Sequence, residues 1–504
     1  MNKSFCELSV IARLKRLAIT NQSKTAVIEG LSGRSASYGE FWQLIVNRAA
    51  IFRSLGLRRV EKVILLTEQT ITYLQDYYGV LLAGGVAVPV EPDASREMLI
   101  AYAERFQARF IVANGEIFDI RYNRLPAEYS TAPQTPYQNE FELPNPDSEA
   151  IILLTTGTTG KSKGVVSTHK SRFCGADNVV GAYNLDSGYT ALIPQLLSHS
   201  GGLRRVEAMF VCGGTAVIMK PAMFFGEVFA ALRNYHCDVL QLVPTQVAMI
   251  LKSAHKLLMA SARQLKIVAV GSAEVTEAQK EELRNLLPGV RLFNDYGSTE
   301  AIGSAYFEWS AYPPKPYCVG YEARNSRIVF LDECGEPFSA DANTPGLAAT
   351  EGDTLMLGYY GEPGLTASVL VNGRVVSADM GYRGDDGMVY IIGRQSDIIV
   401  SGANKISPSE IETAVSQIRG VKECAVVSKP DELMGQMPAL FIVWEENCAL
   451  PPTDVVNALI AKLERFKVPK PENIFAADSL PHTPGTGKVI KQILKKRLEP
   501  NENS

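Results

Sequence analysis

The sequence predicts an α/β protein with more than one domain. Three observations lead to this prediction: a length of 504 residues, an alternation of strand-like and helix-like segments along most of the chain, and a change to short β runs from about Ile328. A chain this long exceeds what one hydrophobic core usually holds. Alternating strands and helices are typical of a mostly parallel sheet covered by helices.

The N-terminal part begins with a helix and then alternates. Apolar residues recur at helical spacing from Leu8 to Ala18, which predicts an amphipathic helix. Residues 121–147 contain five prolines and few aliphatic side chains, so they form either a surface excursion or a connection between subdomains. Between these segments we expect strands at Lys62–Leu66, Val86–Val90 and Phe110–Ala113 and helices at Ile71–Ala83 and Arg96–Phe106.

The alternation then resumes and gives way to β structure. We expect strands at Thr215–Met219, Val239–Val243, Leu265–Val270 and Val290–Phe293, with helices at Phe225–Tyr235, Gln246–Ala254 and Glu277–Leu287. From about Ile328, short β runs are separated by glycine turns such as Asp386-Gly387.

The last unit, from about Ser401, has the pattern of a small α+β domain. At about a hundred residues it is large enough to fold alone. Its expected elements are the helices Pro408–Ile418 and Asp454–Arg465 and the strands Glu423–Ser428 and Ala439–Trp444.

The composition is that of an ordinary globular protein and argues against a nucleic-acid partner. Apolar residues make up 46% of the chain, and 50 basic and 54 acidic residues give a formal net charge of −4. An extended nucleic-acid surface needs a basic excess that neutralises phosphates. A single small nucleotide is still compatible, because its charge can be met locally.

The cysteines and apolar segments favour a cytoplasmic location. The eight cysteines are scattered and none is paired as CxxC, so we expect thiols in a reducing compartment. Charged residues such as Glu7 and Arg13 interrupt any apolar run near the N-terminus, whereas a signal peptide needs an uninterrupted apolar run. The apolar stretch Gly79–Val90 is too short to span a bilayer, so no transmembrane segment is expected.

The segment Ile151–Gly164 has the features of a phosphate-binding loop. A buried strand leads into a run of threonines and glycines that ends in lysines. Glycines allow consecutive backbone N–H groups to face an anion, hydroxyls donate further hydrogen bonds, and lysine adds charge. A Walker A loop is excluded, because Thr155 stands where that motif needs glycine. The alternative for this loop taken alone is a plain surface turn.

A second block, from Asn294 to Glu300, follows an expected strand. An aromatic side chain can stack on a purine, an amide can contact its edge, and a carboxylate can hold Mg²⁺. Ligands of α/β proteins bind at such strand ends. Taken singly, a Tyr-Gly turn and a solvated glutamate are ordinary surface features.

Two further blocks carry a carboxylate, an arginine and a lysine. Asp379 and Arg394 can bind ribose hydroxyls or phosphate, although an isolated aspartate of this kind is more often a turn or cap residue. Near the C-terminus, Pro484–Lys488 places one lysine between glycines, which alone would be an ordinary exposed tail.

Together these four blocks, in this order, resemble the adenylate-forming superfamily. That superfamily includes acyl- and aryl-CoA synthetases, the adenylation domains of peptide synthetases, and firefly luciferase. The resemblance extends from Ser37 to Lys488 and is closest in pattern to acyl- or aryl-CoA ligases. It implies an N-terminal region (1–396) of two βα subdomains plus a small β region, and a small mobile α+β lid (397–504).

The resemblance also implies roles for individual residues. Tyr296 would stack on adenine, Asn294 would contact its edge, and Asp295 belongs to the same cofactor-binding block. The catalytic residues would be Lys488, Thr299 at the α-phosphate, and Glu300 as the Mg²⁺ ligand. The phosphate loop is matched by Thr155, Thr156, Gly157, Thr158, Thr159, Gly160 and Lys163, and the ribose pair by Asp379 and Arg394.

The implied reaction brings two anions, a carboxylate and ATP, together. Mg²⁺, loop N–H groups and Lys488 would stabilise the charge that shifts toward pyrophosphate. For transfer of the acyl group to a thiol, the lid would swing about Asp397, and Gly402 and Ala403 would line the thiol's approach.

Three of the motif blocks depart from the pattern of the superfamily. Ser162 replaces the usual proline in the phosphate loop, and Ser377-Ala378 precedes Asp379 in place of Thr-Gly. Asp295 replaces a glycine that many CoA ligases carry before the adenine-stacking tyrosine. None of these changes removes a group with an implied catalytic role.

The expected acyl site is formed by His199, Gly271, Ser272, Ala273 and Gly297. The stretch Pro194–Leu203 lacks the aspartate that amino-acid-activating members use to pair an ammonium group. Its His199, Gly202 and Leu203 are similar to the His-x-x-Gly-Leu of CoA ligases, although a lone histidine is more often structural. We therefore expect a neutral or hydrophobic acyl group: an aryl, fatty or β-substituted acid.

The acceptor and the rival functions stay open at this point. Coenzyme A is favoured over a carrier-protein phosphopantetheine, which offers the same thiol. A stand-alone enzyme that loads an aryl, fatty or amino acid onto a carrier protein is the alternative. The rivals of other classes are a catalytically inert nucleotide-binding protein and a luciferase-like oxygenase.

Overall fold

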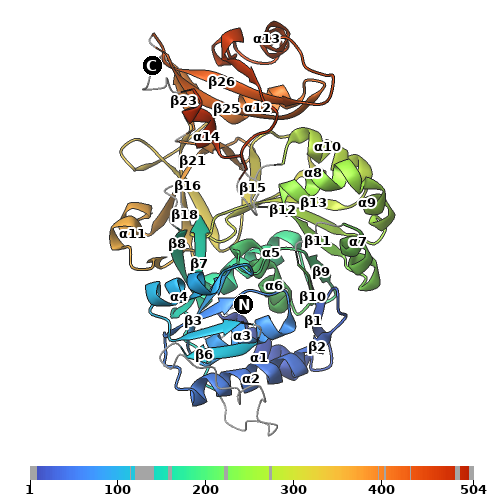
Figure 1. The fold of residues 1–504 in the computed structure, drawn as a ribbon, viewed down its shortest axis with the longest axis vertical. Coiled ribbons are helices and arrows are strands. Elements are labelled where there is room, and N and C mark those ends of the chain that lie inside the picture. Colours follow the sequence, from blue (N-terminus) through green and yellow to red (C-terminus); the bar gives the residue numbers. More distant parts are fainter. Residues whose placement is uncertain are drawn as a thin grey trace.

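The computed structural model describes residues 8–498 apart from 114, 120–140, 157–161, 221–224, 272–274, 396, 402–403, 432 and 483–488. Figure 1 shows a large body coloured blue to green, a yellow β region, and a smaller orange and red C-terminal part at the top of the view. The predicted α/β fold with a smaller C-terminal domain is confirmed. The boundary expected at residues 396 and 397 stays a prediction.

The first large sheet has a parallel half that ends next to the candidate site. Its strands pair in parallel in the order β13, β12, β11, β9, β10, β1, and β2 pairs antiparallel at the edge. Their bounds are β13 (Arg291–Tyr296), β12 (Ile267–Gly271), β11 (Val239–Leu242), β9 (Thr190–Ile193), β10 (Thr215–Ile218), β1 (Thr25–Glu29) and β2 (Ser35–Ser37).

The second sheet carries the candidate phosphate loop. Strands β7, β4, β3 and β5 are parallel, whereas β6, β8 and β19 pair antiparallel with their neighbours. Their bounds are β3 (Lys62–Leu66), β4 (Val86–Val90), β5 (Phe110–Ala113), β6 (Glu116–Asp119), β7 (Glu149–Thr156), β8 (Ser162–Thr168) and β19 (Gly358–Tyr359).

One hydrophobic core joins the two sheets. It contains residues of both sheets, such as Val27 and Val63, together with buried faces of five helices. These helices are α1 (Val10–Thr20), α2 (Tyr38–Ser54), α3 (Ile71–Leu82), α5 (His169–Tyr183) and α6 (Ser200–Cys212). The outer faces are covered by α4 (Arg96–Arg105), α7 (Phe225–Asn234), α8 (Pro244–Ser253), α9 (His255–Ser261) and α10 (Glu277–Leu286).

The β region continues the first sheet with antiparallel strands. In chain order its last strand is β22, which pairs with β15 and β21 and leads toward the C-terminal part. Its members are β14 (Ala305–Glu308), β15 (Cys318–Glu322), β16 (Ser326–Leu331), β17 (Pro337–Phe338), β18 (Gly346–Gly352), β20 (Leu370–Val371), β21 (Arg374–Arg383) and β22 (Val389–Arg394), with the helix α11 (Pro363–Val369).

The C-terminal part has its own sheet and core. Apolar residues such as Ile411 and Leu440 are fully buried between its sheet and helices. Its strands are β23 (Ile399–Ser401), β24 (Asn404–Ile406), β25 (Val421–Asp431), β26 (Gly435–Trp444) and β27 (Ile474–Ala476), and its helices are α12 (Pro408–Ser416), α13 (Pro452–Ile460) and α14 (Lys491–Lys496).

Among the helices that the periodicity did not predict are α2, α5 and α6. Nearly all of α5 is buried, including Arg172, Asp177 and Asn178, so it has no single apolar stripe. An amphipathic pattern marks a helix at the edge of a core and is lost when the whole helix is enclosed. No helix in the described part of the chain is long and apolar enough to cross a membrane.

Candidate active site

The strands β7 and β8 form a hairpin that brings the two flanks of the candidate phosphate loop together. Thr155 pairs with Lys163, and Thr156 pairs with Ser162. Gly157, Thr158, Thr159 and Gly160, like the Thr156 side chain, lie outside the described residues. The described flanks therefore fix where the loop begins and ends, at the carboxyl end of β7. The roles of the loop residues stay predictions.

The short strand β19 links this hairpin to the Thr299-Glu300 block. The Leu357 and Tyr360 N–H groups donate to the carbonyls of Val166 and Gly164 on β8, each at 2.8 Å. On the same segment, the Met356 N–H donates to the Glu300 carbonyl at 2.8 Å. Backbone hydrogen bonds thus hold two separate motif blocks against one strand.

Tyr359 on β19 extends this link to side chains. Its hydroxyl donates to Glu300 Oε1 at 2.8 Å, and Lys163 Nζ lies 5.3 Å from its ring centroid. Burial raises the pKa of Tyr359, and the neighbouring Glu300 raises it further, so the phenol stays protonated as a donor. The predicted residues Lys163 and Glu300 therefore meet through a tyrosine that sequence reasoning missed.

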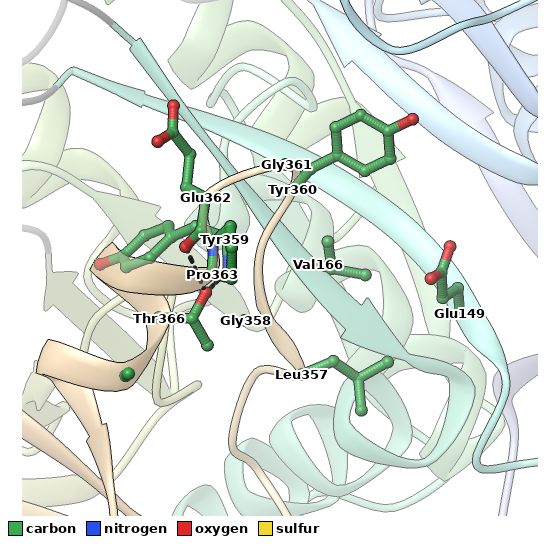
Figure 2. A pocket seen from close by; sticks show the side chains of 11 residues that line it. Glu149, Val166, Leu357, Gly358, Tyr359, Tyr360, Gly361, Glu362, Pro363 and Thr366 are labelled. Carbon is green, nitrogen blue, oxygen red and sulfur yellow. Dashed lines mark hydrogen bonds between the residues drawn. The ribbon is translucent and has the colours of Figure 1, made fainter.

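Figure 2 shows that Tyr359 and the next residue, Tyr360, project from the strand in opposite directions. The Tyr360 hydroxyl instead donates to the Phe106 carbonyl at 3.2 Å. The Thr366 hydroxyl accepts the Tyr359 N–H at 2.9 Å and holds the strand in place. The hollow beside it, about 470 Å³, is lined by Glu149 and Glu362, and no described lysine or arginine lines it, so its described walls do not suit a phosphate.

The ribose-binding candidates lie in contact with the adenine-stacking candidate. The Tyr296 hydroxyl donates to Asp379 Oδ2 at 2.8 Å. Arg394 Nε lies 3.5 Å from Asp379 Oδ1, across a β-ladder in which these two residues are directly paired. Burial, reinforced by Asp379, raises the pKa of Tyr296 far above its ordinary value. Three predicted residues from three motif blocks thus form one cluster.

The Tyr296-Gly297 turn needs its glycine for steric reasons. Gly297 has φ of +159°, at the limit of the region that favours glycine, and a Cβ there would lie 2.7 Å from the Gly303 nitrogen. The Ser298 hydroxyl accepts the Glu300 and Ala301 N–H groups at 3.1 Å each, which closes the next turn. Thr299 is half-buried within that turn. The sequence Gly-Ser-Thr-Glu therefore determines the path of the backbone from the end of β13 to Glu300.

Asp295 points to a different part of the site from its neighbour Tyr296. The Tyr183 hydroxyl donates to Asp295 Oδ1 at 2.6 Å, and Arg205 forms an ion pair with Oδ2. Arg204 Nη2 lies 3.6 Å from the same oxygen. The carboxylate is thus engaged by protein side chains, and its predicted place in the cofactor-binding block stays a prediction. The neighbouring Asn294 is half-buried at the end of β13.

The acyl-site candidates lie along β12 and the start of α6. A Cβ on Gly271 would lie 3.7 Å from Arg205 Nη2, so Gly271 lies against the Asp295 cluster. Ser272 and Ala273 are outside the described residues. Gly202 needs its glycine because a Cβ there would overlap the Leu196 carbonyl.

His199 has an acidic partner that sequence reasoning missed. Its Nε2 lies 3.0 Å from Glu91 Oε1, at the carboxyl end of β4, and both side chains are nearly half exposed. The Ser198 hydroxyl donates to the other Glu91 oxygen at 3.2 Å. Although partial burial opposes ionisation, the bond to His199 lowers the pKa of Glu91. Glu91 therefore holds the His199 ring in position, and the role of His199 in the acyl site stays a prediction.

The C-terminal candidates are described only in part. Lys488, Gly402 and Ala403 lie outside the described residues, although His482 and Val489, on either side of the lysine loop, form a β-bridge. The Asp397 N–H donates to the Arg394 carbonyl at 2.9 Å, so the expected hinge follows directly on the ribose candidate. Its role as a hinge stays a prediction.

The residues that sequence reasoning missed gave weak local signals. Tyr359 and Glu91 sit in short segments with no motif of their own. Arg204 and Arg205 gave the clearer signal, because two consecutive arginines interrupt an apolar stretch that continues with Val206 and Ala208. Charged residues inside such a stretch are rarely buried without a partner.

Comparison with known proteins shows the family. A model described as AMP-binding enzyme matches residues 14–360, and a model described as AMP-binding enzyme C-terminal domain matches residues 410–488. A feruloyl-CoA synthase of Amycolatopsis sp. is 27% identical over 497 residues, covering 96% of this chain and 98% of the relative. The 4-coumarate–CoA ligase 3 of Arabidopsis thaliana is 24% identical over 505 residues, covering 94% and 89%.

Solved structures share the fold over nearly the whole chain. ATP-bound MatB from Rhodopseudomonas palustris has a TM-score of 0.85 at 21% identity, with 97% of this chain and 98% of that chain covered. The o-succinylbenzoate CoA synthetase MenE from Bacillus subtilis, in complex with its acyl-adenylate, has a TM-score of 0.80 at 20% identity, with 96% and 97% covered.

Proposed function

Because the chain belongs to the AMP-binding enzyme family, we propose that it activates a carboxylic acid with ATP and transfers the acyl group to coenzyme A. The resemblance to adenylate-forming enzymes and the assignment as an AMP-forming ligase are confirmed by this membership. The two curated relatives described above are a feruloyl-CoA synthase and a 4-coumarate–CoA ligase, which supports an aryl- or acyl-CoA product. The cytoplasmic location expected from the sequence is part of the proposal.

One observation carries the proposal: motif blocks that are distant in the sequence meet at one place. The Tyr296–Asp379 hydrogen bond, 2.8 Å long, joins the adenine and ribose candidates. The contacts from Lys163 through Tyr359 to Glu300 join the phosphate hairpin to the same strand end. A nucleotide needs these groups together, because base, ribose and phosphates are bound at once.

The described residues account for how ATP would be held. The Tyr296 ring would stack on adenine, and the Asp379 carboxylate, which has two acceptor oxygens, would accept ribose hydroxyls. Lys163 would meet the phosphates, for which the loop between β7 and β8 is the proposed binding segment. Arg394, beside Asp379, would balance its charge or bond the phosphate.

Glu300 is suited to Mg²⁺ that arrives with the triphosphate. One of its oxygens accepts from Tyr359, which leaves the other for a cation. No group of three or more His, Cys, Asp or Glu side chains in the described part of the chain could hold a metal by itself. Mg²⁺ commonly binds through one or two carboxylates and substrate phosphates, and would here neutralise phosphate charge.

The reaction follows from the charges that meet. A carboxylate oxygen of the acid attacks the α-phosphorus, a new P–O bond forms, and the bond to pyrophosphate breaks. Lys488 would hold both anions during this step. The coenzyme A thiol then loses its proton and attacks the acyl carbonyl, and AMP leaves. The lid, hinged at Asp397, would bring Gly402 and Ala403 to the thiol for this second step.

The test is a screen of acids with two readouts. Acid-dependent exchange of labelled pyrophosphate into ATP should occur with at least one acid, and thioester should form only when coenzyme A is added. If exchange occurs but no thioester forms with coenzyme A, a carrier-protein phosphopantetheine becomes the favoured acceptor. Absence of exchange across amino, aryl and aliphatic acids would support the inert nucleotide-binding alternative.

A further inference from the structure

A buried cluster of charged side chains lies on the acyl side of Tyr296. Arg205 and Asp295 form its centre, with side chains that are only 4% and 1% exposed. Arg204, on the same helix α6, is the second arginine near the carboxylate. Tyr183 completes the cluster, because its hydroxyl donates to Asp295 and its ring lies 5.6 Å from the Arg205 guanidinium.

This cluster borders the expected acyl site rather than the nucleotide. Gly271, an acyl-site candidate, would bring a Cβ to 3.4 Å from Asp295 Cβ and 3.7 Å from Arg205 Nη2. Gly271 and Asp295 are directly paired between the parallel strands β12 and β13. Asp295 precedes Tyr296 on β13, and neighbouring residues of a strand point to opposite faces. The strand thus presents Tyr296 to one side and the charged cluster to the other.

The charges of the cluster do not balance. Arg204 and Arg205 carry two positive charges, and Asp295 carries one negative charge, which leaves one positive charge in excess. The adjacent pair of Arg172 and Glu207 is neutral, with Arg172 Nη2 close to Glu207 Oε2 at 2.5 Å. A buried charge without a counter-ion is strongly disfavoured, so an anion from outside the chain would stabilise this site.

The arginines also have donors to spare. Nε and Nη1 of Arg205 and Nε of Arg204 are buried and have no hydrogen-bond partner within the described residues. The ring of Tyr306 packs edge-on against Tyr183, and the Tyr306 hydroxyl is likewise buried without a hydrogen-bond partner among the described residues. Buried donors are normally satisfied, and a guanidinium matches a carboxylate in a two-bond geometry. The unpaired donors and the excess positive charge therefore both favour a carboxylate as the ligand.

We infer that the acid activated by this enzyme carries a second anionic group, a distal carboxylate, which Arg205 binds with the support of Arg204. The inference rests on the proposed function and names its substrate class. Asp295 is then a positioning residue: it pairs with Nη2 of Arg205 and leaves Nε and Nη1, which have no partner among the described residues, for the substrate. The reacting carboxylate would be bound separately, at the α-phosphate, where Lys488 is proposed to act.

This inference changes the expectation of a neutral or hydrophobic acyl group. That expectation used the stretch Pro194–Leu203, which ends one residue before Arg204, and the turn at Gly271. The two arginines and the aspartate are distant in the sequence and meet only in the folded chain.

The direct test compares matched acids with the wild-type enzyme. Pyrophosphate exchange is measured for 4-carboxybenzoate, 4-carbamoylbenzoate and 4-methylbenzoate, and for linear dicarboxylates against monocarboxylates of equal length. The amide keeps the hydrogen-bonding shape without the charge. We expect the dicarboxylate of at least one series to have a kcat/KM on the order of 10²-fold above its uncharged partners.

Variants then assign the preference to this cluster. Arg205→Met should remove the preference by raising KM for the dicarboxylate, with KM for ATP unchanged. Arg205→Lys keeps the charge but not the two-bond geometry, and should retain part of the preference. Asp295→Asn adds to the excess positive charge and should increase the preference. If the melting curve shows that Arg205→Met does not fold, the inference is tested by the wild-type kcat/KM ratios and by the preference of Asp295→Asn.

Different outcomes separate this inference from the proposed function. If uncharged acids are activated as well as or better than their dicarboxylate partners in every series, the inference is overturned and the proposed function stands. Equal loss for charged and uncharged acids in Arg205→Met overturns it as well, because Arg205 would then be structural only. If no acid of either kind promotes exchange, the proposed function fails, and this inference fails with it.

Discussion

The two sides of the candidate site are built differently. The nucleotide side is held by hydrogen bonds among mostly half-exposed side chains: Lys163, Tyr296, Glu300, Tyr359, Asp379 and Arg394. The acyl side is built on charges that are almost entirely buried: Arg172, Arg204, Arg205, Glu207 and Asp295. Exposed polar groups can exchange partners with a ligand at low cost, whereas buried charges are tied to the stability of the fold. A substitution on the nucleotide side should therefore affect activity, and one on the acyl side should affect folding as well.

The largest effect on stability is expected from Glu207→Ala. The change leaves Arg172, only 2% exposed, without its counter-ion in the core. Breaking a buried pair in this way costs about 3–5 kcal/mol of unfolding free energy. Urea unfolding followed by circular dichroism measures this loss. The matched control is Asp379→Asn on the nucleotide side, and equal destabilisation by both changes would remove the contrast between the two sides.

The largest effect on catalysis is expected from Lys488→Ala. Losing one preorganised cation should slow adenylation by ~10²–10³ or more. Thioester formation from supplied acyl-AMP should be largely retained, because the lid would swing about Asp397 before that step and present another face to the site. The two half-reactions are measured separately, by pyrophosphate exchange and by coenzyme A consumption. Equal loss of both would contradict the division of roles.

A smaller effect is expected from Asp379→Ala. The change removes the acceptor that binds Tyr296 and is proposed to bind ribose hydroxyls. Losing hydrogen bonds to a charged group should raise KM for ATP by ~10-fold or more, while KM for the acid changes little. Steady-state kinetics with each substrate varied in turn would show this. An unchanged ATP dependence would remove Asp379 from the nucleotide side.

The smallest effect is expected from Tyr359→Phe. It removes only the hydroxyl that donates to Glu300, a loss of about 1 kcal/mol. We expect a several-fold change in the Mg²⁺ concentration needed for half-maximal exchange. Tyr360→Phe is the matched control, because Tyr360 projects the other way and its hydroxyl contacts Phe106 instead. The same Mg²⁺ shift in both variants would mean that the Glu300 contact is not its cause.

The N-terminal strands and helices could largely be predicted because they are local patterns. The expected helix Ile71–Ala83 is α3 (Ile71–Leu82), and the expected strand Val86–Val90 is β4. The helices α5 and α6 were not predicted, because enclosure on all sides leaves no amphipathic period. The hairpin partner β8 was missed as well, because its sequence follows the loop with no break of its own.

By itself, the sequence determined the fold class, the family and the nucleotide-side candidates, because binding a nucleotide needs glycines, hydroxyls and charges in short consecutive runs. Only the tertiary structure decided the rest. Tyr359 meets Glu300 because β19 pairs with β8, and Arg205 meets Asp295 because the fold brings their side chains together from α6 and β13. Such contacts join residues far apart in the chain, and local sequence patterns do not predict which buried charges will pair.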